Sequence, residues 1–104
     1  MAQIKITPQA KKDIAGIYNY ILQDSYQNAE MVATAIIKKI DTLYKQPAIG
    51  KIVKEFNSPE IRELKLFKYR IIYRIVNTGL IQIITIQHSA RLLNNNPHLK
   101  DFFE

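Results

Sequence analysis

Polar and apolar positions alternate most clearly in the second half of the chain, over the range Ile61–Arg91. This stretch is dense in Ile, Leu, Tyr and Val, which fit the pleated surface of a β-sheet, and it holds little Gly or Pro. One turn signal, Asn77-Thr78-Gly79, divides it. The pattern therefore predicts a hairpin of Tyr69–Val76 against Leu80–His88, preceded by a shorter strand at Ile61–Leu66.

The first half of the chain carries a helical pattern instead. The alternation of Gln3–Ile6 predicts a short first strand. Thr7 and the proline after it then form a helix start, because the Thr hydroxyl can accept a hydrogen bond from a free amide of the first turn. Apolar residues recur at helical spacing over Pro8–Gln23 and again over Tyr26–Lys45. Pro47 stops the second helix, and the short connection predicts an antiparallel helical hairpin.

This order of elements, one strand, two helices and three strands, predicts an α+β domain of two layers. Four strands would form the sheet, with the helical hairpin on one face and the last three strands in an antiparallel meander. The first strand could join the sheet beside any of the others. The range 46–60, punctuated by Pro47, Gly50 and Pro59, is predicted to be irregular. At 104 residues the chain is expected to form a single domain, 1–104.

Alternation within the strand Tyr69–Val76 separates two kinds of side chain. Two tyrosines and two isoleucines point to one side, which has the bulk to pack against helices. Arg70 and Arg74 point to the other side, together with Ile72 and the final valine. If helices cover one face, the second face is left free. The two arginines then either contact a partner there or merely keep an open face soluble.

Charge is unevenly distributed along the chain. The formal net charge is +6, and the range 47–91 holds eight Lys or Arg against three acidic residues, a surplus of +5. Such a surplus favours an acidic partner, either nucleic acid or an acidic protein segment. The absence of Cys excludes disulfides and thiolate metal sites, and two His without metal-ligand spacing indicate neither a metal site nor a cofactor. No signal pattern or apolar run of about 20 residues is present, so a soluble cytoplasmic protein without a membrane span is expected.

Five segments are informative as a set because of their order. They are ITPQAKKDIAGIYNYI, QPAIGK, RELKL, YRIIYRI and ITIQHSAR. Together they span nearly the whole chain and resemble the RelE/ParE superfamily of bacterial toxins from type II toxin–antitoxin modules. Asp13, which the helical pattern places toward water, is followed by Ile17 and Tyr18. These residues, the Pro47–Gly50 segment and the HSAR ending are most similar to the ParE branch.

The resemblance implies two alternative mechanisms. ParE-like members bind DNA gyrase and trap its cleaved DNA without bond-making chemistry of their own, whereas RelE-like members are ribosome-dependent endoribonucleases that cleave mRNA. Both kinds are held inactive by a cognate antitoxin protein, so a toxin–antitoxin hetero-oligomer or a homodimer is expected. We favour the ParE-like function in plasmid stabilisation, with the RelE-like ribonuclease as the alternative. A relative that has lost its target and a plain nucleic-acid-binding domain are further alternatives, the latter disfavoured because no exposed aromatic stripe suited to stacking is evident.

Basic residues of the predicted sheet are the candidate contacts with the target. They are Arg62, Lys65, Arg70, Arg74, His88 and Arg91. For the ribonuclease alternative, His88 is the natural acid or base, Arg70 would bind phosphate, and Glu63 could be a second acid or base. Two features oppose that alternative: the basic cluster before the strands is reduced to Lys51 and Lys54, and no tyrosine follows Tyr73. No catalytic residue is therefore favoured.

The register of the predicted hairpin decides whether Arg70 and His88 can share a site. With Val76 opposite Leu80, His88 falls on the arginine face. With Asn77 opposite Leu80, it falls on the tyrosine face, because a slip of one residue inverts every side chain. The sequence allows both registers.

Overall fold

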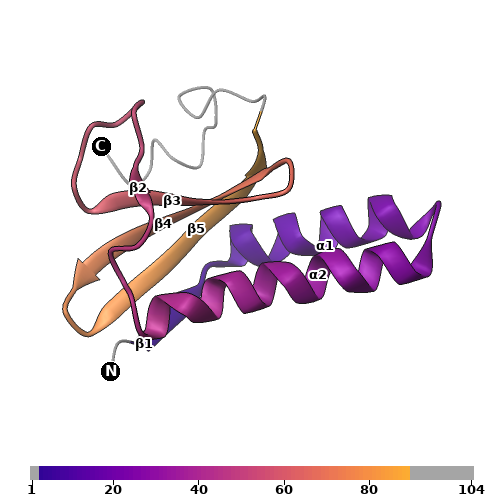
Figure 1. The fold of residues 1–104 in the computed structure, drawn as a ribbon, viewed down its shortest axis with the longest axis horizontal. Coiled ribbons are helices and arrows are strands. Elements are labelled where there is room, and N and C mark those ends of the chain that lie inside the picture. The colour runs from indigo at the N-terminus through magenta and orange to yellow at the C-terminus, as the bar shows by residue number, and fades with distance from the viewer. Residues whose placement is uncertain (1–2, 90–104) are drawn as a thin grey trace.

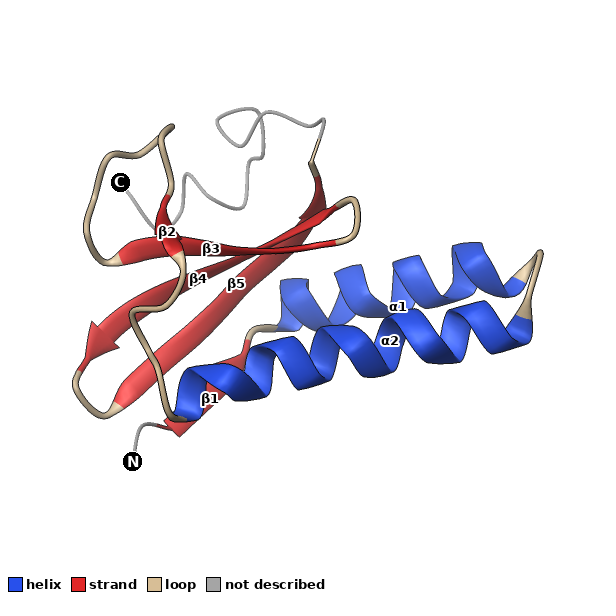
Figure 2. Cartoon of the chain, in the orientation of Figure 1, coloured by secondary structure: helices blue, strands red, loops and turns tan. Residues whose placement is uncertain are grey.

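The computed structural model describes residues 3–89 (Figure 1). Its elements in chain order are β1 (Gln3–Ile6), α1 (Pro8–Leu22), α2 (Tyr26–Asp41), the 3₁₀ turn η1 (Thr42–Tyr44), β2 (Lys51–Ile52), β3 (Ile61–Leu66), β4 (Tyr69–Asn77) and β5 (Leu80–His88). One sheet holds the five strands of the described range, and the antiparallel helices lie against one of its faces (Figure 2). The predicted α+β class, with two layers and a helical hairpin, is therefore confirmed.

The strand order across the sheet is β1-β5-β4-β3-β2. β3, β4 and β5 form the predicted antiparallel meander, whereas β1 runs parallel to β5, with Ile6 opposite Ile83. The sequence left the place of β1 open. A parallel neighbour requires a long connection, which the two helices and the meander supply. β2 is a strand that the pattern did not predict. It lies inside the range 46–60, which was expected to be irregular, and it pairs with two residues of β3.

Both helices begin at the predicted residues, Pro8 and Tyr26. The Thr7 side chain accepts a hydrogen bond from the Ala10 amide (3.2 Å), and Ser25 caps α2 in the same way. The Thr7 hydroxyl also lies 2.8 Å from the carbonyl oxygens of Ile83 and Ile84, which fixes the start of α1 beside β5. α2 ends earlier than predicted, because its last turn tightens into η1. Within residues 3–89, neither helix combines the length and the apolar character that a membrane span requires.

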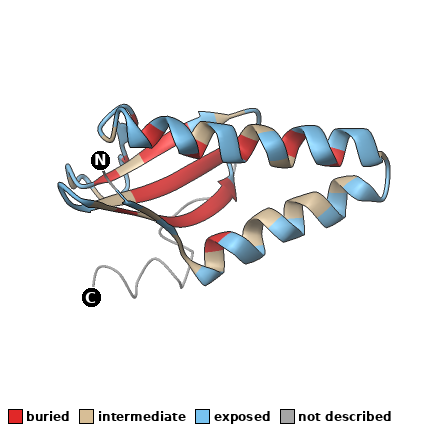
Figure 3. Ribbon diagram, turned by 90° about the horizontal axis from the view of Figure 1, so that it is seen from below, coloured by how far each residue is buried: buried red, intermediate tan, exposed pale blue. Residues whose placement is uncertain are grey.

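A large apolar core fills the space between the helices and the sheet (Figure 3). Its buried residues are Ala10, Val32, Ile36, Ile40, Leu43, Leu64, Ile71, Tyr73, Ile81, Ile83 and Ile86. The tyrosine face of β4 belongs to this core, as the alternation predicts, and the outward sides of both helices are exposed. Burial of these side chains holds the helical pair on the sheet, at about 25 cal/mol for each Å² of apolar surface removed from water.

The arginine face of β4 is not the open surface that the alternation suggested. Val53, Ile61, Ile72 and Ile84 form a second, smaller buried cluster, and Phe56 packs against it. Val53 and Phe56 belong to the segment between β2 and β3, so this segment folds over the arginine face. The expectation of a free face was wrong because the irregular segment carries apolar side chains that are buried there.

Asp13 joins α1 to β5 instead of facing water. Its carboxylate accepts hydrogen bonds from the Ile86 amide (3.0 Å) and from the Thr85 hydroxyl. β1 ends opposite Ile83, so the β5 backbone beyond that point has no partner from β1 and needs acceptors from elsewhere. Asp13 supplies one of them, and the expectation that it faces water was wrong for this reason.

The β4–β5 hairpin combines both registers that the sequence allowed. Asn77 lies opposite Leu80 at the turn, and two irregularities, one on each side of the range 73–75, then shift the pairing. The first shift brings the middle of the hairpin into the other register, and the second shift cancels the first. At the far end Tyr69 lies opposite His88, with the two rings edge to face and their centroids 6.2 Å apart. His88 is therefore on the tyrosine face.

Candidate functional site

A basin lies over β2, β3 and β4 on the sheet face away from the helices. It is lined by Lys51, Ile52, Lys54, Glu55, Glu63, Lys65, Arg70 and Ser89. We call it the basic basin, because four of these residues are cationic and two are anionic. Its volume is about 580 Å³ and it opens to solvent, so it suits a macromolecular surface better than an enclosed small ligand. The described residues gather no group of three or more His, Asp or Glu side chains that could hold a metal ion.

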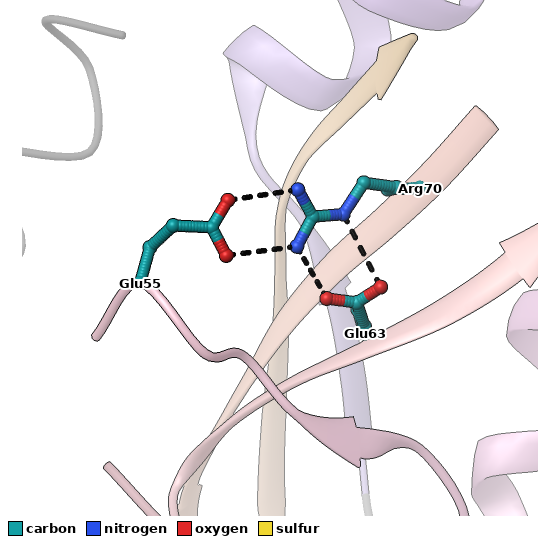
Figure 4. Close-up of polar contacts among 3 residues, drawn as sticks. All are labelled: Glu55, Glu63 and Arg70. Atoms are coloured by element: carbon teal, nitrogen blue, oxygen red, sulfur yellow. Dashed lines mark hydrogen bonds and ion pairs between the residues drawn. The ribbon is translucent and has the colours of Figure 1, made fainter. Parts of the chain in front are cut away.

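Arg70 lies in this basin between two carboxylates (Figure 4). Its Nη1 and Nη2 donate to Glu55 Oε2 (2.9 Å) and Oε1 (3.2 Å), and its Nε donates to Glu63 Oε1 (3.2 Å). Nη2 also donates to the other oxygen of Glu63. A guanidinium has five N–H donors, so at most one is left for any other ligand. Arg70 is 9% exposed, which corrects the expectation that it projects into solvent.

The ion cluster of Arg70 with Glu55 and Glu63 explains how a charge can be buried here. The hydrogen bond with Glu55 is the largest cause that raises the pKa of the Arg70 guanidinium; burial acts against it, and Glu63 adds to the rise. Two-point contacts between arginine and carboxylates are the strong form of this interaction. Glu63 comes from β3, whereas Glu55 comes from the segment after β2. The ion cluster therefore fixes that segment to the sheet.

Arg62 and Arg74 lie outside the basin lining and differ in what they hold. Arg62 donates from Nε to the carbonyl oxygen of Pro59 and from Nη1 to that of Gly50, each at 3.0 Å. These bonds tie together the two ends of the segment that covers the arginine face. Arg74 pairs with Glu60 at 3.5 Å, and its side chain is 32% exposed. A partly exposed pair at this distance contributes little to stability.

The structure brings some of the sequence-predicted site residues together and separates others. Glu63, Lys65 and Arg70 meet in the basic basin, where Lys65 is exposed. His88 is exposed on the other face of the sheet, so the Arg70–His88 arrangement that one register allowed is not formed. Arg91 lies outside the described residues.

Sequence reasoning missed Glu55. Glu63 carries a signal, because it lies on the strand predicted to precede the arginine strand and so can reach a cross-strand guanidinium. Glu55 lies in an irregular segment, where no periodicity fixes the direction of a side chain. Lys51 and Lys54, the reduced basic cluster of the sequence, are both exposed, but their place around the basin depends on the unpredicted strand β2.

The Pro47–Gly50 segment is anchored by Tyr73, which lies on the tyrosine face of β4 and not on the face of the basic basin. The Tyr73 hydroxyl accepts a hydrogen bond from the Gly50 amide (2.9 Å) and donates to the Pro47 carbonyl oxygen (2.8 Å). Burial is the main cause that raises the pKa of Tyr73. A Cβ atom at position 50 would lie 2.6 Å from both the Glu63 carbonyl oxygen and the Tyr73 hydroxyl, so this close approach requires glycine. The segment thus positions β2 and its lysine beside β3.

A second groove runs between the end of α2 and the outer edge of the sheet. It is lined by Lys39, Thr42, Gln46, Ile49, Gly50, Lys51, Glu63, Leu64 and Lys65, and we call it the edge groove. β2 pairs with two residues of β3, so the range Leu64–Leu66 has no strand partner on its outer side among the described residues. The edge groove therefore combines three lysines, apolar side chains and an unpaired stretch of strand.

Comparison with known proteins defines the class. Residues 4–93 match the family described as "ParE toxin of type II toxin-antitoxin system, parDE". The chain is 33% identical over 92 residues to Toxin RelE2 of Caulobacter vibrioides, a match that covers 88% of this chain and 100% of that protein. Its fold is similar to a chain of the "Chromosomal ParDE TA system from P. aeruginosa", with a TM-score of 0.69 and 24% identity, over 85% of this chain and 96% of that chain.

The protein is therefore a toxin of a type II toxin–antitoxin system, and its fold is that of the RelE/ParE superfamily. The chain belongs to the ParE toxin family. A system of this type implies a cognate antitoxin as its partner. The names of the matched family and of the matched relative come from both branches of the superfamily. The choice between gyrase inhibition and mRNA cleavage thus rests on the chemistry of the site.

Proposed function

We propose that this protein is a ParE-like toxin that inhibits DNA gyrase in the cytoplasm, and that it is not a RelE-like ribonuclease. The ion cluster is the observation that supports this most directly. Because carboxylates occupy four of the five N–H donors of Arg70, at most one donor is left for a phosphate, and a two-point contact would require the guanidinium to give up bonds. The same two carboxylates, Glu55 and Glu63, oppose the binding of a phosphate directly at Arg70.

The chemistry of RNA cleavage gives a second argument. Attack by the 2′-OH needs a base for that hydroxyl, an acid for the leaving oxygen and cations beside the phosphorane. Glu63 is engaged with Arg70, and His88 lies on the opposite face of the sheet. These residues are therefore not arranged as an acid and a base around one phosphate. A toxin that acts by binding its target needs no such pair.

Exposed cations of the basic basin are the proposed contacts with the target. Lys65 is the sequence-predicted residue that is most available for this, and Lys51 and Lys54 share the basin with it. Arg74 lies further along the same face of β4 and is a second proposed contact. Arg62 and Arg70 act indirectly, because they hold the covering segment in place. His88 and Arg91, the other two sequence-based candidates, are not needed for this contact.

Induction of the toxin without its antitoxin in a bacterial host tests the choice between the two targets. We expect the DNA-damage response to rise before translation stops, and purified toxin to make gyrase accumulate cleaved DNA. Purified toxin added to ribosomes on a defined mRNA should produce no A-site cleavage. Site-specific cleavage that disappears in a His88→Ala variant, and persists in a Lys11→Ala control on the exposed side of α1, would overturn the proposal and establish the ribonuclease.

The edge groove is the proposed seat of the antitoxin. An acidic, extended segment could pair with the outer side of Leu64–Leu66 while its charges meet the lysines of the groove. Ile49, which is 52% exposed there, offers an apolar contact that salt does not weaken. The rate of association should fall as salt rises, whereas the formed complex should survive high salt.

Co-expression with the product of the adjacent open reading frame tests this seat. Ile49→Asp should reduce co-purification of the toxin with the antitoxin, and Met31→Asp, at a similarly exposed apolar position on α2, is the matched control. If Met31→Asp blocks the complex and Ile49→Asp does not, the antitoxin lies across the helices instead. Absence of any complex between the two wild-type proteins would contradict the pairing itself.

A further inference from the structure

The turn between β3 and β4 presents an aromatic side chain on an unfavourable backbone. Leu66 pairs with Tyr69, so Phe67 and Lys68 alone form the turn. Phe67 has a φ of 54°, in the left-handed region that glycine adopts readily and a bulky residue rarely adopts. A positive φ at the first position of a two-residue hairpin turn is normally supplied by Gly, Asn or Asp.

Packing within the described fold does little to offset the cost of this backbone conformation at Phe67. The residue is 60% exposed, so its ring buries little apolar surface in the described fold. The other turn of the meander is built conventionally, with Gly79 donating its amide to Asn77 Oδ1 at 2.7 Å. Asn57, the other described non-glycine residue at positive φ (48°), is of a type that tolerates this region. A phenylalanine at position 67 is therefore better explained by contact with another molecule than by the stability of the toxin itself.

The turn is held rigidly enough to present its ring in one place. The Lys68 carbonyl oxygen accepts hydrogen bonds from the Ser89 amide (2.7 Å) and from the Ser89 hydroxyl (2.8 Å). These bonds join the tip of the β3–β4 hairpin to the end of β5. A side chain on such a support loses less conformational freedom when it binds, which favours affinity.

The charge around the turn indicates what kind of surface it would meet. Lys65 and Lys68 flank the ring in sequence, and both are exposed. The carboxylates of the adjoining basin, Glu55 and Glu63, are engaged by Arg70. The exposed charge beside Phe67 is thus positive, and a matching surface would be acidic around an apolar centre.

A protein fits these features better than a nucleic acid does. Single-stranded nucleic acids bind in basic grooves that carry several aromatic side chains for stacking. The basic basin is lined by no aromatic side chain among the described residues, and it holds two carboxylates. The hollow on the other face, which Lys68 lines, contains Tyr20 and Tyr69 but also the Asp13 carboxylate. A single projecting ring at a hairpin tip is instead the form that an anchor takes when it enters a pocket on a protein.

We propose that Phe67 is the anchor by which this toxin docks on the protein that it inhibits. The ring enters an apolar pocket on that protein, and acidic side chains at the border of the pocket contact Lys65 and Lys68. The strain of the turn is carried by the free toxin and is compensated when the ring is buried in the complex. This inference rests on the toxin function, but not on gyrase as the target.

Replacement of Phe67 by Asn tests the anchor, because Asn adopts the left-handed region more easily than Phe. The Phe67→Asn variant should unfold at the same temperature as the wild type or at a higher one. It should nevertheless need at least about tenfold more inducer to arrest growth in the host, the loss expected for a central aromatic contact. Phe67→Tyr keeps a ring and should stay toxic.

Met31→Asn is the matched control, since Met31 is a similarly exposed apolar residue on α2, away from the proposed contacts with the target. It should leave toxicity unchanged. Two results would overturn the anchor: full toxicity of Phe67→Asn, or a fall of its unfolding temperature together with its toxicity. Full toxicity together with loss of co-purification with the antitoxin would make Phe67 an antitoxin contact.

Binding to purified DNA gyrase separates this inference from the proposed function. If wild-type toxin binds gyrase and Phe67→Asn binds at least about tenfold more weakly, both stand. If wild-type toxin does not bind gyrase, the proposed function fails, and the growth assay still decides the role of Phe67. Affinity for a labelled single-stranded RNA is measured in parallel. An equal loss of RNA affinity in Phe67→Asn would overturn the protein anchor in favour of base stacking.

Discussion

Over the range 70–73, both faces of β4 are buried, but by different chemistry. On the tyrosine face, Ile71 and Tyr73 join a large apolar core under the helices. On the arginine face, Ile72 belongs to a smaller apolar cluster, and Arg70 is enclosed by the ion cluster with Glu55 and Glu63. The burial of the tyrosine face is stabilised by many apolar contacts of similar kind, whereas the burial of the arginine face also requires a few specific ionic bonds.

This difference teaches that charge on a strand does not by itself mark a solvent-exposed face. A helix pair covers the tyrosine face as a preformed layer, so its cover can be anticipated from helical periodicity. The cover of the arginine face is a segment of irregular structure that carries its own counter-ion, Glu55. The same face can therefore be polar in sequence and buried in the fold.

Removal of the buried cation should have the largest effect. Arg70→Met leaves Glu55 and Glu63 without their shared partner, and we expect it to lower the free energy of unfolding by about 3–5 kcal/mol. Urea unfolding monitored by circular dichroism measures the change. The triple variant Arg70→Met, Glu55→Gln, Glu63→Gln should recover a large part of the loss, because it removes the unpaired charges as well. If the single variant is as stable as the wild type, burial on the arginine face does not depend on the ion cluster.

A smaller loss of stability is expected for a substitution on the tyrosine face. Tyr73 is buried in the apolar core there, and its hydroxyl also makes hydrogen bonds. Tyr73→Phe keeps the ring in the core but removes both hydrogen bonds to the Pro47–Gly50 segment. We expect the free energy of unfolding to fall by about 1–3 kcal/mol, because a buried amide and a buried carbonyl lose their partner. Ile71→Val, which removes one methylene from the same core, is a control without a polar component.

The effect of Tyr73→Phe should also change with pH. Burial raises the pKa of Tyr73 in the folded protein above its usual value of 10.0. The stabilisation linked to the neutral hydroxyl is therefore complete below pH 10 and is lost as pH rises through the folded-state pKa. Unfolding measured from neutral to alkaline pH should show a steeper decline for the wild type than for the variant. Parallel declines would mean that Tyr73 does not titrate with a raised pKa.

Much of the fold could be predicted because its signals are local. Thr7 marks the start of α1, periodicity marks both helices, and the Asn77–Gly79 turn marks the last hairpin. The place of β1 and the existence of β2 depend on pairing between distant residues, which no local pattern encodes. The two register shifts of the β4–β5 hairpin were also unpredictable, because each compensates the other and neither carries a glycine.

The candidate site was predicted in part for the same reason. Cross-strand pairing of two predicted strands brings Glu63, Lys65 and Arg70 together. The expected exposure of Arg70 failed because the bonds of Glu55 come from a segment whose path is set by tertiary contacts. The expectation that Asp13 faces water failed for a similar reason. The β5 amide that it binds is free only because β1 ends opposite Ile83, and the sequence did not predict where β1 pairs.

A gain in stability is expected for a substitution in α1, one of the two helices that cover the tyrosine face. Gly16 lies in the interior of α1, and a Cβ atom built there meets nothing within 4 Å. Gly16→Ala should therefore raise the free energy of unfolding by about 0.5–1 kcal/mol, through lower flexibility of the unfolded chain and better helix propensity. Thermal unfolding measures it. Co-purification with the antitoxin should be unchanged if the antitoxin occupies the edge groove. A destabilised variant would show that α1 packs more closely at this point than its glycine indicates.

The smallest change in stability is expected for Arg74→Gln, although Arg74 shares its face with Arg70. Its side chain is 32% exposed and its pair with Glu60 spans 3.5 Å, so the free energy of unfolding should change by less than about 0.5 kcal/mol. This makes Arg74 the arginine of this face that can be removed without disturbing the fold. If it contacts the target, Arg74→Gln should weaken toxicity, whereas Glu60→Gln, which releases the same guanidinium, should not. Full toxicity of Arg74→Gln in the growth assay would mean that Arg74 only keeps the surface soluble. A loss of stability comparable to that of Arg70→Met would remove the distinction between the buried ion cluster and the exposed pair.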